Sequence, residues 1–141
     1  QGHIASFTEA AQQADILIVG INSDASVKRL KGPGRPVQNE NARALILASL
    51  VITDAIVIFE EDTPLHLIRS ILPDVLVKGG DYTVDQIAGA KEVIAHGGKI
   101  HIAKIVAGFS TTETINKISS NKKVKTKMNT NYPLLMRVAI Q

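Results

Sequence analysis

Short apolar runs rich in β-branched residues alternate with amphipathic segments along most of this 141-residue chain. The run ILIVGI at residues 16–21 is short and continuously apolar, which is typical of a strand buried on both faces. The preceding segment, residues 4–14, repeats its apolar side chains at helical spacing. The same reasoning predicts strands at residues 16–21, 55–59, 74–77 and 99–106, and helices at residues 4–14, 39–51, 63–72 and 110–119. Residues 85–96 are predicted to form one or two helical segments.

Strict alternation of helix and strand predicts βαβ units with right-handed crossovers, and therefore an α/β fold with a parallel sheet. The composition agrees, because a sheet covered by helices buries both strand faces, and hydrophobic residues make up 45% of the chain. Since the order begins with a helix, we expect a further strand upstream of it. Residues 22–36 are polar and carry Gly and Pro, so we expect a long loop there with one helical turn at residues 25–30. We expect Thr63 to cap the helix that follows it, with Pro64 at the first helical position.

The composition also limits the cellular location and the classes of binding partner that we expect. The chain has no cysteine, which excludes disulfides and thiolate metal sites and favours a cytoplasmic location. No apolar run reaches the roughly 18 residues of a membrane helix and no signal peptide is visible, so we expect no membrane partner. The formal charge of +3 comes mainly from lysines within residues 117–127. They lack interleaved aromatic residues, so we interpret residues 121–141 as a solvated extension and expect no nucleic-acid partner.

The first candidate sites are a helix start and a basic loop, at positions where open α/β sheets bind ligands. Gly2 and His3 open the first predicted helix, whose free N–H groups suit phosphate, although a frayed terminal histidine is the simpler interpretation. In the loop after the first predicted strand, four cations can close over polyphosphate or form an ordinary solvated surface. These are Lys28, Arg29, Lys31 and Arg35.

Two further candidates follow the later strands. The string KGGDY at residues 78–82 comes directly after a predicted strand, and its glycines let a ligand approach the backbone closely, although a tight turn explains it too. The string GFSTT at residues 108–112 offers hydroxyls and amides at a helix start, as either an anion site or an ordinary cap. The remaining histidines, His66, His96 and His101, are scattered, and we expect structural roles for them.

Several strings occur in an order that resembles a known family. VGINSDASVKRLKGPGRPV, FEEDTPLHLI, PDVLVKGGDYTVDQIAGAKEV and GFSTTETINKI together resemble the adenylyltransferase domain of bacterial heptose 1-phosphate adenylyltransferases, within the cytidylyltransferase-like nucleotidyltransferases. The resemblance covers residues 1–118 and implies a Rossmann-like, three-layer domain at residues 1–120. The family carries a His-x-Gly-His motif, of which Gln1, Gly2 and His3 match the last three positions. We therefore expect the first histidine and the first strand to lie upstream of Gln1.

The resemblance implies a role for each candidate residue. His3 would stabilise charge on the α-phosphate and, with Lys31, act in catalysis. Lys31, Arg35 and Arg43 would hold phosphate or substrate. The implied nucleotide-binding residues are Gly2, His3, Lys78, Gly79, Asp81, Gly108, Ser110, Thr111 and Thr112. Related cytidylyltransferases have an arginine where this chain has Ile105, and this departure favours the heptose branch.

The implied reaction joins ATP and a heptose 1-phosphate into ADP-heptose and pyrophosphate, with Mg²⁺ carried by the nucleotide phosphates rather than by a protein metal motif. A cytidylyltransferase that makes CDP-glycerol or a similar CDP-alcohol is the alternative within the same fold. A nucleotide-binding module without turnover is the alternative from another class. A homodimer is plausible for the family, although the sequence shows no interface pattern.

Overall fold

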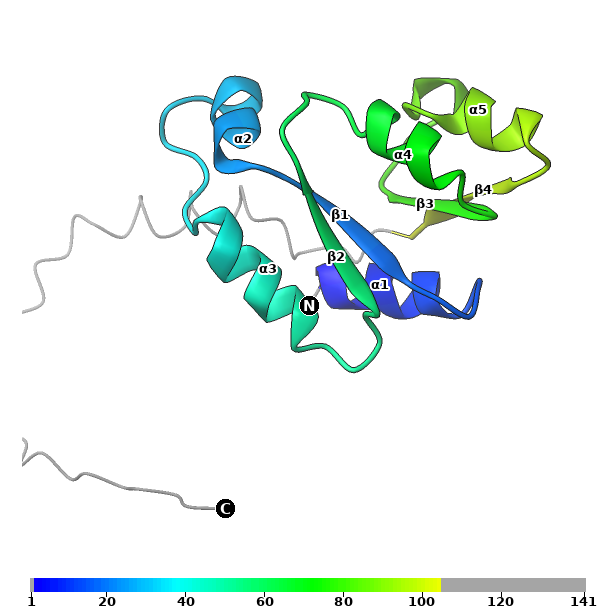
Figure 1. Ribbon diagram of the computed structural model, residues 1–141, viewed down its shortest axis with the longest axis horizontal. Helices are drawn as coiled ribbons and strands as arrows, with labels where there is room; N and C mark the ends of the chain where they lie inside the picture. Colours follow the sequence, from blue (N-terminus) through cyan, green and yellow to red (C-terminus); the bar gives the residue numbers. More distant parts are fainter. Residues whose placement is uncertain (1, 105–141) are drawn as a thin grey trace, which may run out of the picture. The chain divides into compact units, whose positions relative to one another are not determined.

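Two pairs of parallel strands form the centre of the computed structural model, which describes residues 2–104 (Figure 1). Strand β1 (Ile18–Asn22) pairs with β2 (Ala55–Phe59), with Ile18 opposite Ala55. Strand β3 (Val75–Gly79) pairs with β4 (Lys99–Ala103), with Val75 opposite Lys99. The parallel pairing predicted from the alternation is confirmed, although the expected single sheet is present as two separate pairs.

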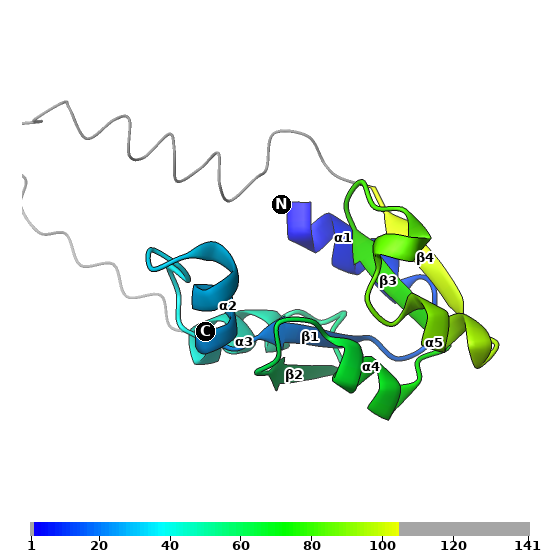
Figure 2. The ribbon, with the colours of Figure 1, turned by 90° about the horizontal axis from the view of Figure 1, so that it is seen from above.

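Helices connect the strands as the alternation predicted. They are α1 (Gly2–Ala11), α2 (Asp24–Lys31), α3 (Glu40–Ala48), α4 (Leu65–Ile71), the short 3₁₀ helix η1 (Val84–Gln86) and α5 (Ala90–Ala95). Helix α3 packs on β1 and β2, while α1 and α5 pack on β3 and β4. Figure 2 shows α1 and α4 on opposite sides of the strands.

Local side-chain contacts explain where two of the helices begin. The Ser23 hydroxyl accepts a hydrogen bond from the Ser26 amide and caps α2, and the Asn39 side chain caps α3 by accepting from the Ala42 amide at 2.8 Å. Gly32, with a φ of 89°, follows α2 in a conformation that favours glycine. These caps satisfy amides that the first turn of a helix leaves without partners.

The tightest packing joins α4, α5 and β4. Val93 and Ala103 are fully buried, and Ala90 and Ile68 are almost so. Gly89 has a φ of 85°, and a Cβ there would lie 2.7 Å from Ile68. Glycine at this position therefore lets α5 start directly against α4.

Several details of the sequence-based prediction are wrong. Helix α1 begins and ends two or three residues earlier than predicted, α3 ends at Ala48 and β4 ends at Ala103. Residues 24–31 form a complete helix instead of a loop with one turn, because Ser23 caps it and tertiary contacts hold it. Helix α4 follows Pro64 without a side-chain cap, so Thr63 does not have the capping role expected of it. Strands β1 and β3 begin and end one or two residues later than predicted, since their pairing with β2 and β4 decides their limits. The predicted helix at residues 110–119 lies outside the described residues.

Candidate functional site

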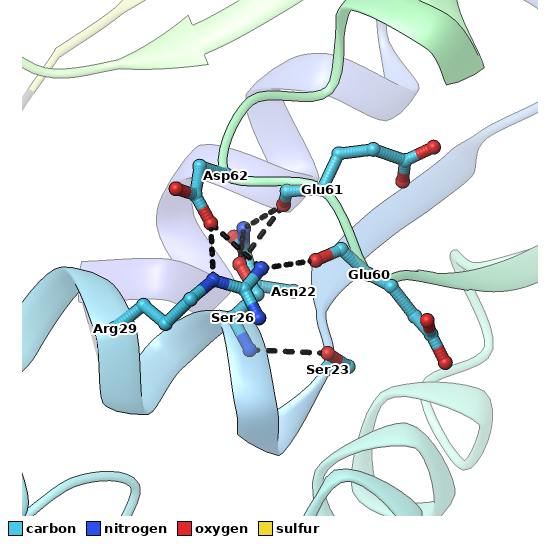
Figure 3. A network of polar contacts seen from close by, with 7 residues as sticks. All are labelled: Asn22, Ser23, Ser26, Arg29, Glu60, Glu61 and Asp62. Atoms are coloured by element: carbon cyan, nitrogen blue, oxygen red, sulfur yellow. Dashed lines mark hydrogen bonds and ion pairs between the residues drawn. The ribbon is translucent and has the colours of Figure 1, made fainter.

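A network of hydrogen bonds connects the turn that follows β1 to the turn that follows β2 (Figure 3). The Ser26 side chain is fully buried, donates to the Glu61 carbonyl at 2.9 Å and accepts from the Asn22 side-chain amide at 2.9 Å. The Asn22 amide also donates to the Glu61 carbonyl at 3.3 Å. The first turn of α2 is therefore fixed at the carboxyl ends of β1 and β2.

Arg29 extends this network along α2. Its Nε donates to Asp62 Oδ1 at 2.8 Å, and its Nη2 donates to the Glu60 carbonyl at 2.5 Å (Figure 3). Since both contacts involve the turn after β2, the Arg29 side chain is directed toward that turn. Of the two interpretations left open for these four cations, closure over polyphosphate does not fit Arg29, which has a structural role.

The other three cations of this region remain available for an anion. Within residues 2–104, no hydrogen bond or ion pair engages the side chains of Lys28, Lys31 and Arg35. Lys28 and Lys31 are exposed on α2, and Arg35 is partly exposed in the segment after it. These cations lie on or just after the helix that the buried network fixes in place.

Arg43 connects α3 to the carboxyl end of β1. Its Nη2 donates to the Asn22 carbonyl at 2.9 Å and to Asp24 Oδ1 at 2.8 Å. The neighbouring Glu40 carboxylate accepts from the Asp24 amide at 2.6 Å. Arg43 was predicted to support a phosphate site, and its contacts are with the turn that leads into α2. Its Nε is buried without a partner among the described residues.

The KGGDY segment at the end of β3 has a defined geometry. The Lys78 ammonium lies 5.4 Å from the centre of the Tyr82 ring, which is a cation–π distance. Gly80 has a φ of 136°, and a Cβ there would lie 2.5 Å from the Tyr82 ring, so the aromatic ring covers the bare Cα. A Cβ on Gly79 would lie 3.2 Å from the Ser6 hydroxyl, which places α1 beside the end of β3. Asp81 is exposed.

The predicted catalytic pair is not in mutual contact. His3 is exposed in the first turn of α1, next to Gly2, and its ring stacks on Phe7 with centroids 6.4 Å apart. Among the described residues, His3, Lys31 and Lys78 make no contact with one another. The remaining predicted site residues, Gly108, Ser110, Thr111 and Thr112, lie outside the described part of the chain.

One histidine, His101, has the structural role that we expected. His101 on β4 donates from Nε2 to Glu9 Oε1 of α1 at 2.8 Å, and this hydrogen bond lowers the pKa of the Glu9 carboxyl. Glu9 also accepts from the Lys104 amide at 3.2 Å. His66 is exposed, with its Nδ1 3.9 Å from the Glu61 carboxylate. Within residues 2–104, no group of three or more His, Cys, Asp or Glu side chains is placed to hold a metal ion.

Residues 1–126 match the family described as cytidylyltransferase-like. The chain belongs to this family. The match confirms the family resemblance that the motifs indicated. Among the residues that the structure describes, no helix is long and apolar enough to cross a membrane.

Named relatives within the cytidylyltransferase-like family are similar to this chain at high identity. It is 55% identical over 117 residues to the "Bifunctional protein HldE" of Mesorhizobium japonicum, and that match covers 83% of this chain and 24% of the relative. The protein of the same name from Rhodospirillum rubrum is also 55% identical over 117 residues. The chain thus spans about a quarter of the length of these relatives.

A solved structure confirms the α/β fold class. The lipopolysaccharide core biosynthesis protein of Thermoplasma volcanium superposes with a TM-score of 0.57 at 22% sequence identity. The alignment covers 74% of this chain and 84% of that protein. The Rossmann-like, cytidylyltransferase-type architecture expected from the motifs is therefore confirmed.

Sequence reasoning missed the polar network around Ser26. The spacing of Ser23 and Ser26 was a usable signal, because a serine cap bonds the amide of the third residue after it. The partners of Ser26 and Arg29 on the turn after β2 gave no such signal, since they lie more than thirty positions away in the sequence.

Proposed function

We propose that this chain transfers AMP from ATP to a heptose 1-phosphate, giving ADP-heptose and pyrophosphate for lipopolysaccharide or related glycan precursors. The observation that carries this proposal is the 55% identity to proteins named HldE over the region that contains the LVKGGDY and STT motifs. We further propose that residues 1–120 form the nucleotidyltransferase domain and that residues 121–141 are a C-terminal extension of it.

The chemistry requires anion binding more than proton transfer. A phosphate oxygen of the sugar phosphate forms a bond to the α-phosphorus of ATP, and the bond from that phosphorus to the β-phosphate bridging oxygen breaks, so pyrophosphate leaves. The acceptor oxygen is already ionised at neutral pH, so the reaction needs no general base. Positioning of two polyanions and neutralisation of charge at the α-phosphate are what the protein supplies.

The described residues include the cations for this task. Lys31 and Arg35 would bind phosphate groups, since their side chains have no protein partner within residues 2–104. His3 in the first turn of α1 would stabilise charge on the α-phosphate. Arg43 would act through the turn that it holds, because it contacts Asn22 and Asp24.

Lys78 and its neighbours would form the nucleotide side of the site. Lys78, Gly79 and Asp81 follow β3 at the carboxyl edge, where nucleotides bind in open α/β sheets. Gly2 would contribute from the start of α1, and Gly108, Ser110, Thr111 and Thr112 are proposed from the motif alone. Mg²⁺ carried by the nucleotide would supply positive charge that neutralises the phosphates.

The test is pyrophosphate release by the full-length protein with Mg²⁺, crossing ATP and CTP against heptose 1-phosphate and glycerol 3-phosphate. Release with ATP and heptose 1-phosphate alone is the expected result. Release with CTP and glycerol 3-phosphate would keep the fold and the chemistry but replace both substrates. No release from a folded protein that still binds nucleotide would replace the enzyme with a nucleotide-binding module.

A further inference from the structure

Lys78 is held by an aromatic ring and, among the described residues, by no charged partner. Its ammonium lies 5.4 Å from the centre of the Tyr82 ring. Within residues 2–104, no carboxylate forms an ion pair with it. Arg43 differs, because Asp24 lies 2.8 Å from its guanidinium and balances its charge. Lys78 therefore combines a fixed partner with a positive charge that nothing in this part of the chain balances.

The backbone on both sides of Tyr82 determines where its ring lies. Gly80 has a φ of 136°, and a Cβ there would lie 2.5 Å from the ring, so the ring is placed directly over the bare Cα. The Gly80 amide donates to the Ala103 carbonyl of β4 at 3.3 Å. On the other side, the Thr83 amide donates to the Gln86 side chain at 3.0 Å in the capping box of η1. Hydrogen bonds therefore fix the chain shortly before and directly after Tyr82.

The Tyr82 ring is not a core side chain. It is 44% exposed, whereas Val93 and Ala103 are fully buried. An aromatic ring stabilises a fold mainly through the area that it removes from water, and a half-exposed ring removes less. The contact that distinguishes Tyr82 is therefore the one with the Lys78 ammonium.

A cation held by a ring suits anion binding better than a cation held by a carboxylate. The face of an aromatic ring attracts a cation through its quadrupole and carries no net charge. The ammonium therefore keeps its positive charge, and the N–H donors that do not point at the ring remain free to bind oxygen. A lysine that is already held also loses less rotamer freedom when it binds a ligand.

The pair lies where an anion can reach it. Lys78 is the last residue but one of β3, and its side chain is exposed. Lys78 and Tyr82 line a groove that Asn22, at the carboxyl end of β1, also borders. Nucleotides bind beyond the carboxyl ends of the strands in open α/β sheets, so a phosphate at this edge meets an ammonium that is already in place.

We propose that Tyr82 is a positioning residue whose ring holds the Lys78 ammonium at the carboxyl end of β3 for a phosphate group of the nucleotide. The inference rests on the proposed function, because it takes a nucleoside triphosphate as the anion. Tyr82 acts through Lys78 and needs no contact with the substrate. An aromatic ring is required at this position, whereas the phenolic hydroxyl is not.

The first test measures the Kd of Mg-ATP by titration calorimetry in the full-length wild type, Tyr82→Leu, Lys78→Met and the double variant. An exposed cation–π contact corresponds to about a 2- to 5-fold change in an equilibrium constant, so Tyr82→Leu should raise the Kd by that factor. In the Lys78→Met background, Tyr82→Leu should have no further effect, because the residue through which Tyr82 acts is missing. An equal effect of Tyr82→Leu in both backgrounds would show a merely structural role and overturn the inference.

Tyr82→Phe separates the ring from the hydroxyl. It keeps the aromatic face, so it should restore the affinity that Tyr82→Leu loses. A loss in Tyr82→Phe as large as in Tyr82→Leu would assign the effect to the hydroxyl and contradict the inference. Val84→Ala, which changes another partly exposed side chain nearby, is the matched control and should leave the Kd unchanged. Tyr82→Met takes the place of Tyr82→Leu if that variant loses cooperative thermal unfolding.

NMR spectroscopy observes the contact without any ligand and decides the matter if Lys78→Met binds too weakly to measure. Protons over the face of an aromatic ring are shifted upfield. The Lys78 ε-methylene signal should therefore lie upfield in the wild type and in Tyr82→Phe, and at its ordinary position in Tyr82→Leu. An ordinary position in the wild type would overturn the inference.

Failure of the inference and failure of the proposed function give different results. If both are correct, Tyr82→Leu raises the KM for ATP and leaves kcat unchanged, as expected for binding that the ground state and the transition state share. Pyrophosphate release with equal KM values in the wild type and Tyr82→Leu would contradict the inference alone. Mg-ATP binding without pyrophosphate release would contradict the proposed reaction, while the Kd comparison would still decide the role of Tyr82. A folded wild type that binds no Mg-ATP would overturn both.

Discussion

His101 of β4 and Glu9 of α1, which are 92 positions apart in the sequence, share a hydrogen bond of 2.8 Å. Glu9 also accepts from the Lys104 amide, so one carboxylate joins the first helix to β4 and to the residue that follows it. The hydrogen bond from His101 is the largest cause that lowers the pKa of the Glu9 carboxyl. This contact therefore makes the docking of α1 depend on pH.

Replacement of Glu9 by glutamine should remove a stabilising effect that depends on pH. Because the pKa is lowered on folding, the stabilisation is complete above the unfolded pKa of about 4.3 and is lost as the pH falls through the lower folded value. Urea unfolding of the wild type and Glu9→Gln should therefore differ at pH 7, and the difference should shrink as the pH falls below the unfolded value. Asp15→Asn, which changes an exposed carboxylate outside this contact, is the control. A gap that stays constant from pH 7 to pH 3 would contradict the assignment.

Ser26 and Arg29 should contribute differently to stability, although both join α2 to the turn after β2. Ser26→Ala removes a fully buried hydroxyl that donates to Glu61, so it should lower the free energy of unfolding by about 1–3 kcal/mol. Arg29→Ala removes a half-exposed ion pair with Asp62 and should cost about 1 kcal/mol or less. Chemical denaturation of both variants under identical conditions tests whether Ser26→Ala lowers the free energy of unfolding more than Arg29→Ala does.

A larger loss from Arg29→Ala than from Ser26→Ala would show that the exposed pair dominates the network. Asp62→Asn completes a double-mutant cycle with Arg29→Ala, which isolates the ion pair from the bond that Arg29 makes to the Glu60 carbonyl.

Most of the α/β order could be predicted because it is a local property of the sequence. The run at residues 55–59 coincides with β2, and the glycines at 97 and 98 follow α5 as expected. Helix α2 was predicted only as a single turn at residues 25–30, because its polar composition and the following Gly and Pro are typical of a loop. Its contacts with the turn after β2 provide the tertiary stabilisation that local propensity does not predict.

The sequence could predict where along the fold the candidate site residues lie, but not which side chains they contact. Lys78 does follow a strand, yet its cation–π contact with Tyr82 depends on the positive φ of Gly80 between them. Arg43 was selected through the resemblance, while its bonds to Asn22 and Asp24 depend on how α3 packs beside β1. Such contacts connect segments that are distant in the sequence, so the spacing of apolar residues along the chain does not predict them.

Gly89→Ala should destabilise the contact between α4 and α5. The φ of 85° disfavours any side chain, and the new Cβ would lie 2.7 Å from Ile68, which is itself nearly buried. The expected loss is about 1–3 kcal/mol, as for other overpacked positions. Gly34→Ala is the matched control, because nothing lies within 4 Å of its Cβ position and its φ is not positive. Its effect should stay within about 0.5 kcal/mol. Equal effects of the two variants in thermal unfolding would contradict this explanation.

Lys31→Ala should separate a role in catalysis from a role in folding. The Lys31 side chain has no hydrogen bond or ion pair within residues 2–104, so its loss should leave the unfolding midpoint unchanged. If it contacts phosphate in the transition state, turnover in the pyrophosphate assay should fall by about 100-fold or more. Lys99→Ala, at the opposite end of the fold's strands, is the charge-matched control and should keep full activity. Equal rates for Lys31→Ala and the wild type would remove Lys31 from the site, whereas equal losses in both variants would indicate a general effect of charge.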